Sequence, residues 1–345
     1  MKKVLALLFF LLHIHHLWAC STFLLNKNGQ LVFGRNYDWV TGNGMVMVNA
    51  RNVKKTSFAP ENEKTITWIS SCGSITFNQF GKEFPHGGMN EKGLVVELMW
   101  LNGTSYPEAD DRPALNELQW IQYQLDNFAT VDEVLANQSK IRIGRQGVAP
   151  LHYLIADASG NAATIEFIQG KTVIHTGKDL KTPVLTNTIY ADALKQYESK
   201  GRGYDNSNER FAIACKMTKE FQQAKNTQQP VAFAFEVLDK IAQGNYTKWR
   251  IVYDITDRKI HFIANGNQRK MISFNAYKFD CSENALAYHL NTKDNDSSIT
   301  FKPLHFDANR KLIETSARES SNQLDIPFLM IAGAAQYFNE VQCAQ

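Results

Sequence analysis

Two short runs with a strand-like pattern, Ser21–Asn26 and Leu31–Asn36, lie on either side of Asn28-Gly29. An Asn-Gly pair between two such runs is the strongest short-range signal for a β-hairpin. If this pair forms the turn, the numbers of opposing residues sum to 57, which places Cys20 opposite Tyr37. The pattern therefore predicts that Cys20 lies at the open end of a hairpin.

The chain beyond this hairpin alternates between strand-like and helix-like patterns. Further strands are predicted from apolar or alternating runs at Met45–Ala50, Thr65–Ser71, Ser74–Phe80, Leu94–Leu101, Leu151–Ala156, Ala163–Ile168, Thr172–His175, Trp249–Ile255, Lys259–Ala264 and Met271–Ala276. We expect Thr65–Ser71 and Ser74–Phe80 to form a hairpin. A second hairpin is expected around Asp257-Arg258, between Trp249–Ile255 and Lys259–Ala264. The three runs between residues 151 and 175 predict a meander.

Helices are predicted where apolar residues recur at helical spacing or where a capping signal opens a segment. These segments are the stripe Leu115, Leu118, Ile121 and Leu125, the segment opened by the capping box Thr130-Val131-Asp132-Glu133, and the runs Asn206–Gln222 and Pro230–Ala242. A C-terminal helix is predicted from Asp325-Ile326-Pro327 toward Val341, and we expect its Phe328, Ile331 and Phe338 to lie in the core. Antiparallel hairpins with paired helices between them predict an α+β fold. No linker-like stretch divides residues 20–345, so we expect a single domain in which the polar run Asn291–Ser298 is a surface loop.

The first 19 residues have the layout of a secretion signal. Lys2 and Lys3 form a basic start, Val4–Leu12 is apolar, and the segment ends in the small residue Ala19. Such a segment is too short and wrongly flanked to span a membrane stably. We therefore expect residues 1–19 to be a signal peptide, and the mature chain to begin at Cys20 and to be periplasmic or secreted without membrane insertion.

A mature chain beginning at Cys20 would carry a thiol and a free α-amino group on one residue. An α-amine titrates at roughly pKa 7.7–8.0, so it can act as general base for its own thiol. Arg35 is a diagonal neighbour of Cys20 on the same face of the hairpin, where its guanidinium would favour the thiolate. Asp38 would hold the amine, provided that the strand ends or bulges there. The alternative is an ordinary surface hairpin with solvated side chains.

Composition and cysteine spacing narrow the function further. The 345 residues are 44% hydrophobic and 21% charged, with a net charge of +3. This balance argues against nucleic acid as a partner, because phosphate binding requires a basic footprint. The remaining cysteines, Cys72, Cys215, Cys281 and Cys343, show no metal-ligand spacing, so we expect no metal site. In an oxidising compartment they could form up to two disulfides, whose pairing the sequence does not decide.

Five motifs in order resemble the choloylglycine hydrolase and penicillin V acylase family, linear-amide hydrolases of the N-terminal-nucleophile class. The motifs are Cys20-Ser21-Thr22, Gly34-Arg35-Asn36-Tyr37-Asp38-Trp39, Gly88-Met89-Asn90-Glu91-Lys92-Gly93-Leu94, Val184-Leu185-Thr186-Asn187 and Glu209-Arg210-Phe211. The resemblance spans residues 20 to about 210. It implies an αββα sandwich of two stacked antiparallel sheets between helix layers, and a reaction that needs no metal or organic cofactor.

The resemblance also implies roles for individual residues. Cys20 is the nucleophile, Arg35 and Asp38 support it and its amine, Asn187 supplies the oxyanion-hole side chain, and Arg210 lies near the nucleophile. A turn-forming Asn and an exposed helical Arg are the ordinary alternatives for the last two.

The sequence departs from the family at one position of the oxyanion hole. Ten residues beyond Asn90, the family usually has an Asn or Tyr whose backbone N–H completes that hole, and here Trp100 stands there with Asn102 two residues further on. His86 and Glu97, nearby, match no catalytic position of the family.

These inferences predict a periplasmic or secreted cysteine amidase that cleaves a linear, non-peptide amide through a thioester. Family substrates are conjugated bile acids, penicillin V and N-acyl homoserine lactones. We expect an apolar acyl group bound by Trp39, Trp100, Asn102 and the loop Thr41–Gly44 with Met45 and Met47, unless Trp100 is simply part of the core.

Two other functions remain open. One is an acyltransferase on the same fold. The other is a non-catalytic binding protein lipidated at Cys20, since Leu17-Trp18-Ala19-Cys20 partly resembles a lipoprotein box. A homo-oligomer, either a dimer or a tetramer, is also left open.

Overall fold

The computed structural model describes residues 20–60, 62–144, 148–203, 205–223, 228–281, 286–291 and 299–344. The expected signal peptide lies outside these ranges, as does nearly all of the predicted surface loop Asn291–Ser298. Within the described ranges, no helix is long and apolar enough to cross a membrane.

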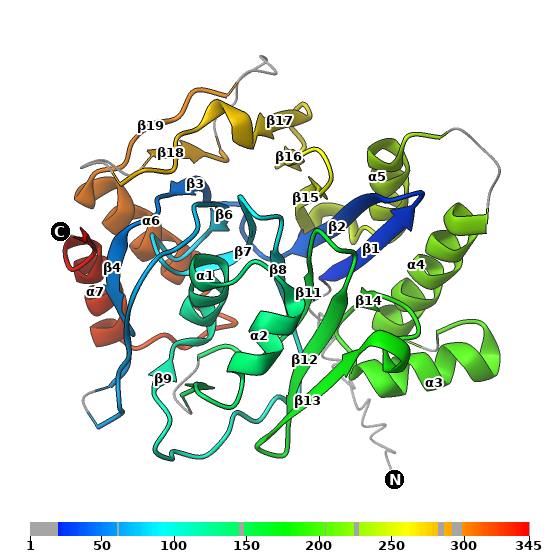
Figure 1. The fold of residues 1–345 in the computed structure, drawn as a ribbon, viewed down its shortest axis with the longest axis horizontal. Coiled ribbons are helices and arrows are strands. Elements are labelled where there is room, and N and C mark those ends of the chain that lie inside the picture. Colours follow the sequence, from blue (N-terminus) through cyan, green and yellow to red (C-terminus); the bar gives the residue numbers. More distant parts are fainter. Residues whose placement is uncertain are drawn as a thin grey trace, which may run out of the picture.

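The first of two large sheets is antiparallel and contains the N-terminal hairpin (Figure 1). Its six strands, in spatial order, are β14 (Val184–Leu185), β1 (Ser21–Lys27), β2 (Gln30–Asp38), β15 (Thr247–Asp254), β16 (Lys259–Ala264) and β17 (Lys270–Ser273). The predicted register is confirmed, because Ser21 lies opposite Asn36. Asn28 and Gly29 both have positive φ, 54° and 80°, as a tight hairpin turn requires. The hairpin β15–β16 is also confirmed.

The second large sheet is antiparallel throughout and packs against the first. Its nine strands, in spatial order, are β13 (Lys171–Thr176), β12 (Ala162–Ile168), β11 (Leu151–Ala156), β8 (Val95–Trp100), β7 (Pro85–Asn90), β6 (Ser74–Asn78), β3 (Met45–Asn49), β18 (Leu286–His289) and β19 (Lys302–Pro303). The predicted meander is confirmed as β11–β12–β13.

One predicted hairpin is wrong. The run Ser74–Phe80 forms β6, but β6 lies between β7 and β3. The run Thr65–Ser71 instead forms β5 (Thr67–Ile69), which pairs with β4 (Val53–Thr56) in a small sheet with β20 (Gln342–Cys343). The backbone between β5 and β6 does not close a hairpin turn. Its N–H groups at Ser71 and Cys72 donate instead to the carbonyl of Asp126 in α1 (Glu117–Asn127). A second small sheet pairs β9 (Ala114–Leu115) with β10 (Arg142–Ile143) in parallel.

Helices cover the outer faces of the two large sheets (Figure 1). The seven α-helices in the described part of the chain are α1 (Glu117–Asn127), α2 (Val131–Asn137), α3 (Tyr190–Lys200), α4 (Asn206–Gln223), α5 (Pro230–Lys240), α6 (Phe306–Glu319) and α7 (Phe328–Gln336). Helices α4 and α5 pack on β1 and β2, and α1 packs on β7 and β8. The molecule is therefore an α+β protein with the predicted αββα layers.

The two largest core clusters follow these layers. The larger one joins the two sheets to α4 and α5, and the second lies between the nine-stranded sheet and helices α1 and α2. The predicted capping box of α2 is confirmed, since Thr130 and Glu133 exchange side-chain and backbone hydrogen bonds. Helix α1 begins later than its apolar stripe, because Leu115 belongs to β9.

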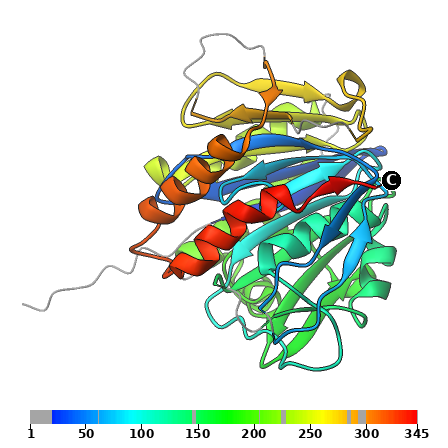
Figure 2. The ribbon, with the colours of Figure 1, turned by 90° about the vertical axis from the view of Figure 1, so that its left-hand side faces the viewer.

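The C-terminal helix is shorter than predicted and less buried. Helices α6 and α7 lie side by side on the outside of the sandwich (Figure 2). Phe328 is not a core residue, because 78% of it is exposed at the first turn of α7. Ile331 and Phe338 are partly buried. Cys281 and Cys343 form a disulfide, whereas Cys20, Cys72 and Cys215 are free and buried.

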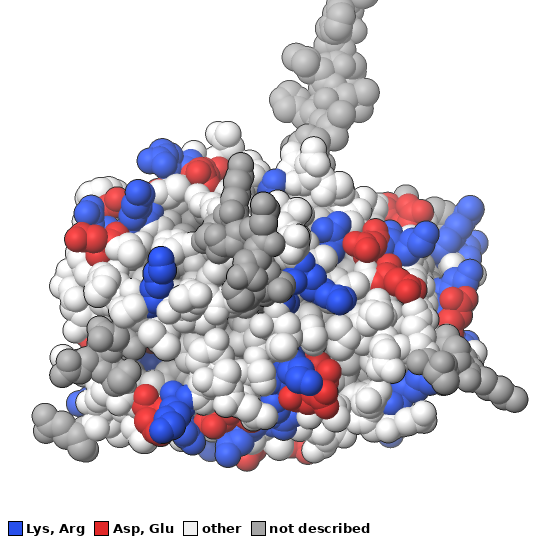
Figure 3. Space-filling view, turned by 90° about the horizontal axis from the view of Figure 1, so that it is seen from above, with Lys and Arg blue, Asp and Glu red and all other residues white. Residues whose placement is uncertain are grey.

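Charged side chains are mixed on the surface. On the face seen in Figure 3, acidic and basic residues lie next to one another both at the rim and within the face, with largely uncharged surface between them.

Candidate active site

Cys20 directly precedes β1 and is buried, with 4% of the residue exposed. Its Sγ lies 3.9 Å from Nη2 of Arg35 and 3.9 Å from the backbone oxygen of Asp38. The contact with Arg35 is the diagonal contact predicted from the register of the hairpin. Burial raises the pKa of the Cys20 thiol, and the positive charge of Arg35 acts in the opposite direction.

Arg35 is fully buried between the two sheets. Its Nη1 forms a 2.5 Å ion pair with Oε2 of Glu97 and donates to the carbonyl of His86, and its Nη2 donates to the carbonyl of Leu98. Burial raises the pKa of Glu97 to about 7, although Arg35 opposes this shift. These contacts fix the guanidinium with one edge toward the sulfur of Cys20.

Asp38 stands at the last position of β2, where the paired strand β15 shifts register between Thr247 and Trp249. One carboxylate oxygen, Oδ1, accepts a hydrogen bond from Oγ1 of Thr247. The other, Oδ2, is buried and has no hydrogen-bond partner among the described residues. Burial raises the pKa of Asp38 to about 6, against the attraction of Arg210. The carboxylate therefore has an unused acceptor oxygen, on a residue whose backbone oxygen lies 3.9 Å from the sulfur of Cys20.

Arg210 and Asn187 complete the group of residues around Cys20. Nη1 of Arg210 donates to the backbone oxygen of Cys20 at 2.7 Å, and Nη2 donates to Oδ1 of Asn187 at 3.0 Å. Nδ2 of Asn187 donates to the carbonyl of Trp100 at 2.7 Å. Arg210 is thus not an exposed helical residue, although it lies on α4. Burial lowers its pKa to about 10, against the attraction of Asp38.

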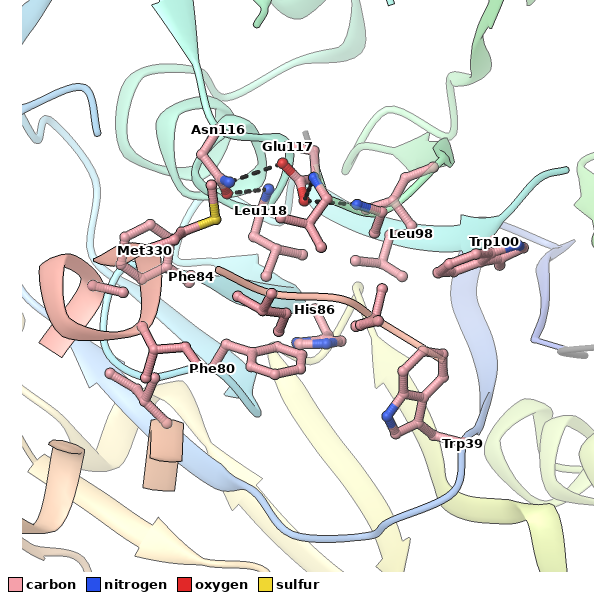
Figure 4. A pocket seen from close by; sticks show the side chains of 18 of the residues that line it. Trp39, Phe80, Phe84, His86, Leu98, Trp100, Asn116, Glu117, Leu118 and Met330 are labelled. Carbon is pink, nitrogen blue, oxygen red and sulfur yellow. Dashed lines mark hydrogen bonds between the residues drawn. The ribbon is translucent and has the colours of Figure 1, made fainter. Parts of the chain in front are cut away.

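A predominantly apolar pocket opens beside Cys20 and encloses about 830 Å³ of empty space, its mouth included. Trp39 and Trp100 lie at one side with ring centroids 6.0 Å apart, and Phe84 and Met330 lie at the other (Figure 4). His86 also lines the pocket, and burial lowers its pKa to about 3, so this imidazole is neutral.

Part of the predicted substrate contact is wrong. Met45 and Met47 are fully buried in a small cluster with Leu312, because their strand β3 is an inner strand of the sheet. Asn102 is not among the pocket residues, and its Oδ1 accepts a hydrogen bond from the indole of Trp100. The loop Thr41–Gly44 does not line the pocket either, since its Thr41 hydroxyl donates to Glu319.

Sequence reasoning missed the opposite wall of the pocket. This wall comes from Phe80, Phe84 and the C-terminal helices, including Ile313, Met330 and Ile331. The apolar segment Phe328-Leu329-Met330-Ile331 was the only signal for it. Among the described residues, no group of three His, Cys, Asp or Glu side chains could hold a metal ion.

Comparison with known proteins identifies the family of this chain. Residues 20–200 match the family model of linear amide C–N hydrolases, choloylglycine hydrolase family. The chain belongs to this family. A curated penicillin V acylase of Pectobacterium atrosepticum is 33% identical over 189 residues, which are 49% of this chain and 49% of that protein. The chain thus spans about half the length of the curated relative that it matches.

Solved structures of related hydrolases have the same fold as most of this chain. Penicillin V acylase from Agrobacterium tumefaciens has a TM-score of 0.69 and 27% identity, covering 83% of this chain and 98% of its own. A mutant conjugated bile acid hydrolase from Clostridium perfringens has a TM-score of 0.63 and 15% identity over 83% of this chain and 97% of its own, and it supports the fold alone. The αββα sandwich is that of the N-terminal-nucleophile hydrolases.

Replacing Arg35 should change the acidity of Cys20. We expect Arg35→Gln to raise the pKa of the Cys20 thiol further, because the neutral amide no longer stabilises the thiolate. The rate of alkylation by iodoacetamide, measured against pH, should then rise at a higher pH than in the unmodified protein. Arg35→Lys keeps the charge and should shift the curve less. Equal curves for all three proteins would show that Arg35 does not act on the sulfur.

Proposed function

We propose that this protein hydrolyses a linear, non-peptide amide with Cys20 as nucleophile, after removal of residues 1–19. The observation that carries the proposal is the position of the Cys20 sulfur. It lies 3.9 Å from Nη2 of Arg35, and it lines an apolar pocket in a chain of the linear amide hydrolase family. The expected signal peptide makes the periplasm or the exterior of the cell the proposed location.

The proposed reaction uses groups of this chain alone. The free α-amine of Cys20 takes the thiol proton, and the sulfur attacks the amide carbonyl. An ammonium group on Cys20 would give Oδ2 of Asp38 the donor that it lacks among the described residues. The proton then passes to the leaving amine as the C–N bond breaks and a thioester remains. Water hydrolyses the thioester, which releases the carboxylic acid and regenerates Cys20.

Asn187 is the proposed side-chain donor to the oxyanion. Its amide orientation is fixed, because Oδ1 accepts from Arg210 while Nδ2 points toward the backbone of Trp100. An Nδ2 group has two N–H bonds, so one remains to stabilise negative charge on the carbonyl oxygen. The backbone of Trp100 lies beside this donor, because its carbonyl accepts the other N–H of Asn187. The side chain of Asn102 instead accepts a hydrogen bond from the indole of Trp100.

Removing the amide of Asn187 should slow the chemical step. We expect Asn187→Ala to lower kcat by about 10²–10³ with little change in KM, because the lost hydrogen bond forms mainly in the transition state. Steady-state kinetics on any hydrolysed amide measure both constants. A raised KM with kcat unchanged would instead assign Asn187 to substrate binding.

The pocket favours an apolar acyl group, with the leaving amine toward solvent. Trp39, Trp100, Phe80 and Phe84 offer aromatic faces, which suit aromatic or flat apolar groups. Penicillin V is therefore the first amide to test, as the names of the two acylase relatives also suggest. Two panels of amides test the orientation, one varying the acyl group and one varying the amine. Larger differences in kcat/KM are expected in the first panel.

Trp100 should contribute to the choice of acyl group. We expect Trp100→Ala to lower kcat/KM by about tenfold for aromatic acyl groups, since a stacking contact is worth about 0.5–1.5 kcal/mol beyond buried area. Short alkyl acyl groups should be affected less. If the amine panel shows the larger spread and Trp100→Ala changes nothing, the orientation is wrong and recognition runs through the amine.

The two other functions make different predictions. An acyltransferase would pass the acyl group to an added amine faster than to water, which product analysis measures. A lipid anchor at Cys20 would leave a diacylated terminus, which the intact mass of the mature protein reveals. The burial of Cys20 in the pocket favours the nucleophile, because an anchored sulfur has to face the membrane.

A further inference from the structure

A buried polar pair lies in the nine-stranded sheet, behind the segment that carries Asn187. His152 on β11 and Glu166 on β12 are both completely buried on adjacent strands. Leu154, two residues from His152 and so on the same face of β11, belongs to the core cluster between the two sheets. Nothing in the proposed reaction uses either side chain, so their burial in this apolar interior calls for another explanation.

The pair holds one end of the turn that carries Asn187. Nδ1 of His152 lies 3.0 Å from Oε1 of Glu166, and Nε2 of His152 lies 2.7 Å from the backbone oxygen of Thr186. A carbonyl oxygen has no proton, so Nε2 of His152 must be the donor in the second contact. The contact with Glu166 needs a second proton, on either Nδ1 or Oε1. With it, the imidazole is held in orientation by Glu166 and fixes the carbonyl that directly precedes Asn187.

Glu166 holds the other end of the same turn. Its two carboxylate oxygens accept hydrogen bonds from the backbone N–H of Tyr190, at 3.1 and 3.3 Å. Tyr190 is the first residue of α3, and the preceding residue, Ile189, provides no side-chain cap. A carboxylate is favourable at a helix N-terminus because it meets free N–H groups and the positive end of the helix dipole. Glu166 thus caps α3 from the neighbouring sheet.

We propose that His152 and Glu166 are positioning residues that hold Asn187 in place for the oxyanion. The turn between Thr186 and Tyr190 is fastened to the rigid sheet at both ends, and the side chain of Asn187 is set by Arg210 and the backbone of Trp100. A displacement of about 1 Å in a catalytic group can cost roughly 10² in rate. The inference rests on the proposed role of Asn187 and adds the residues that keep it in place.

Two substitutions of His152 separate this role from simple packing. In His152→Gln, the amide nitrogen can occupy the place of Nε2 and still donate to Thr186. In His152→Asn, the shorter amide reaches only toward Glu166. We expect His152→Asn to lower kcat by about 10–10², with KM within about twofold, and His152→Gln to retain most of the activity. Glu166→Gln, which preserves side-chain volume, is the second variant and should also lower kcat.

Three further measurements make the test specific. The losses should not add to that of Asn187→Ala in double variants, because all act through one donor. Alkylation of Cys20 by iodoacetamide should keep its normal rate in each variant, since that reaction forms no oxyanion. His175→Gln is the matched control: His175 lies 3.9 Å from Oε2 of Glu166 and its ring contacts that of Tyr190, but its hydrogen bond goes to Thr164 and not to the backbone of the turn, so the variant should leave kcat unchanged.

The outcomes distinguish this inference from the proposed function. Equal losses in His152→Asn and His152→Gln, additive losses with Asn187→Ala, or slowed alkylation would overturn the positioning role. Normal kcat in His152→Asn and Glu166→Gln, while the unmodified protein hydrolyses amides, would also overturn it and leave the proposed function intact. A mature protein that hydrolyses no amide in either panel would contradict the proposed function itself.

Discussion

Cys20→Ala is expected to abolish amide hydrolysis, because no other described thiol lines the pocket. Cys20→Ser should lose most of the activity, since a hydroxyl is far less acidic than a thiol and is harder for an amine to deprotonate. The measurement is steady-state hydrolysis of the best amide from the acyl panel. Treatment of the unmodified mature protein with iodoacetamide should stop turnover, with the label recovered on Cys20.

The two other free cysteines provide the controls for this prediction. Burial raises the pKa of Cys215 to about 12 and also raises the pKa of Cys72, so neither thiol is reactive near neutral pH. Cys215→Ala should therefore keep its activity and its sensitivity to iodoacetamide. Turnover that survives in Cys20→Ala, or inhibition that tracks labelling of Cys72, would rule out the proposed nucleophile.

The sequence was most informative where a local signal determines geometry. Asn28-Gly29 sets both the turn and the register of the first hairpin, and the register alone places Arg35 within reach of Cys20. Asp38 required an irregularity that the pattern could not supply. The structure provides it through the end of β2 and the register shift in β15, a strand more than 200 residues away.

Contacts between distant segments could not be predicted from patterns. The pattern in Thr65–Ser71 predicted a strand but assigned it the wrong partner, Ser74–Phe80. The strand pairs instead with β4, and the backbone after it is held by the carbonyl of Asp126 in α1. Helix α3 was missed, because only Tyr190 and Ala193 of its eleven residues are buried and the helix lacks a side-chain cap of its own. Glu166 caps it from β12, which no local motif reveals.

In the candidate site too, local patterns could not predict the residues that depend on contacts between distant segments. Asn187 follows β14, a strand of two residues with no readable pattern, so only the family resemblance pointed to it. Arg210 likewise had an ordinary alternative on α4, and its burial against Cys20 depends on how α4 packs on β1. The pocket wall from α6 and α7 comes from residues about 300 positions after Cys20, and helical periodicity alone does not say which face meets the pocket.

A chain that retains even one residue before Cys20 should be inactive. The nitrogen of Cys20 is then part of a peptide bond, so it can neither accept the thiol proton nor offer an ammonium group to Oδ2 of Asp38. Loss of a general base alone lowers rates by about 10²–10⁴. The test places the recognition sequence of a site-specific protease directly before residue 20. Activity should appear in proportion to the fraction of trimmed chains measured by intact mass.

Two controls separate the amine from other effects of trimming. Cys20→Ala carrying the same leader should remain inactive after complete trimming, because the base is present but the nucleophile is not. Acetylation of the trimmed protein at its new α-amine should remove the activity again, since an amide nitrogen is not a base. Full turnover by a chain whose extension is still present in the mass spectrum would contradict the mechanism, because the thiol would then have to lose its proton to another group. Asp38, whose pKa burial raises to about 6, would be the first such group to test.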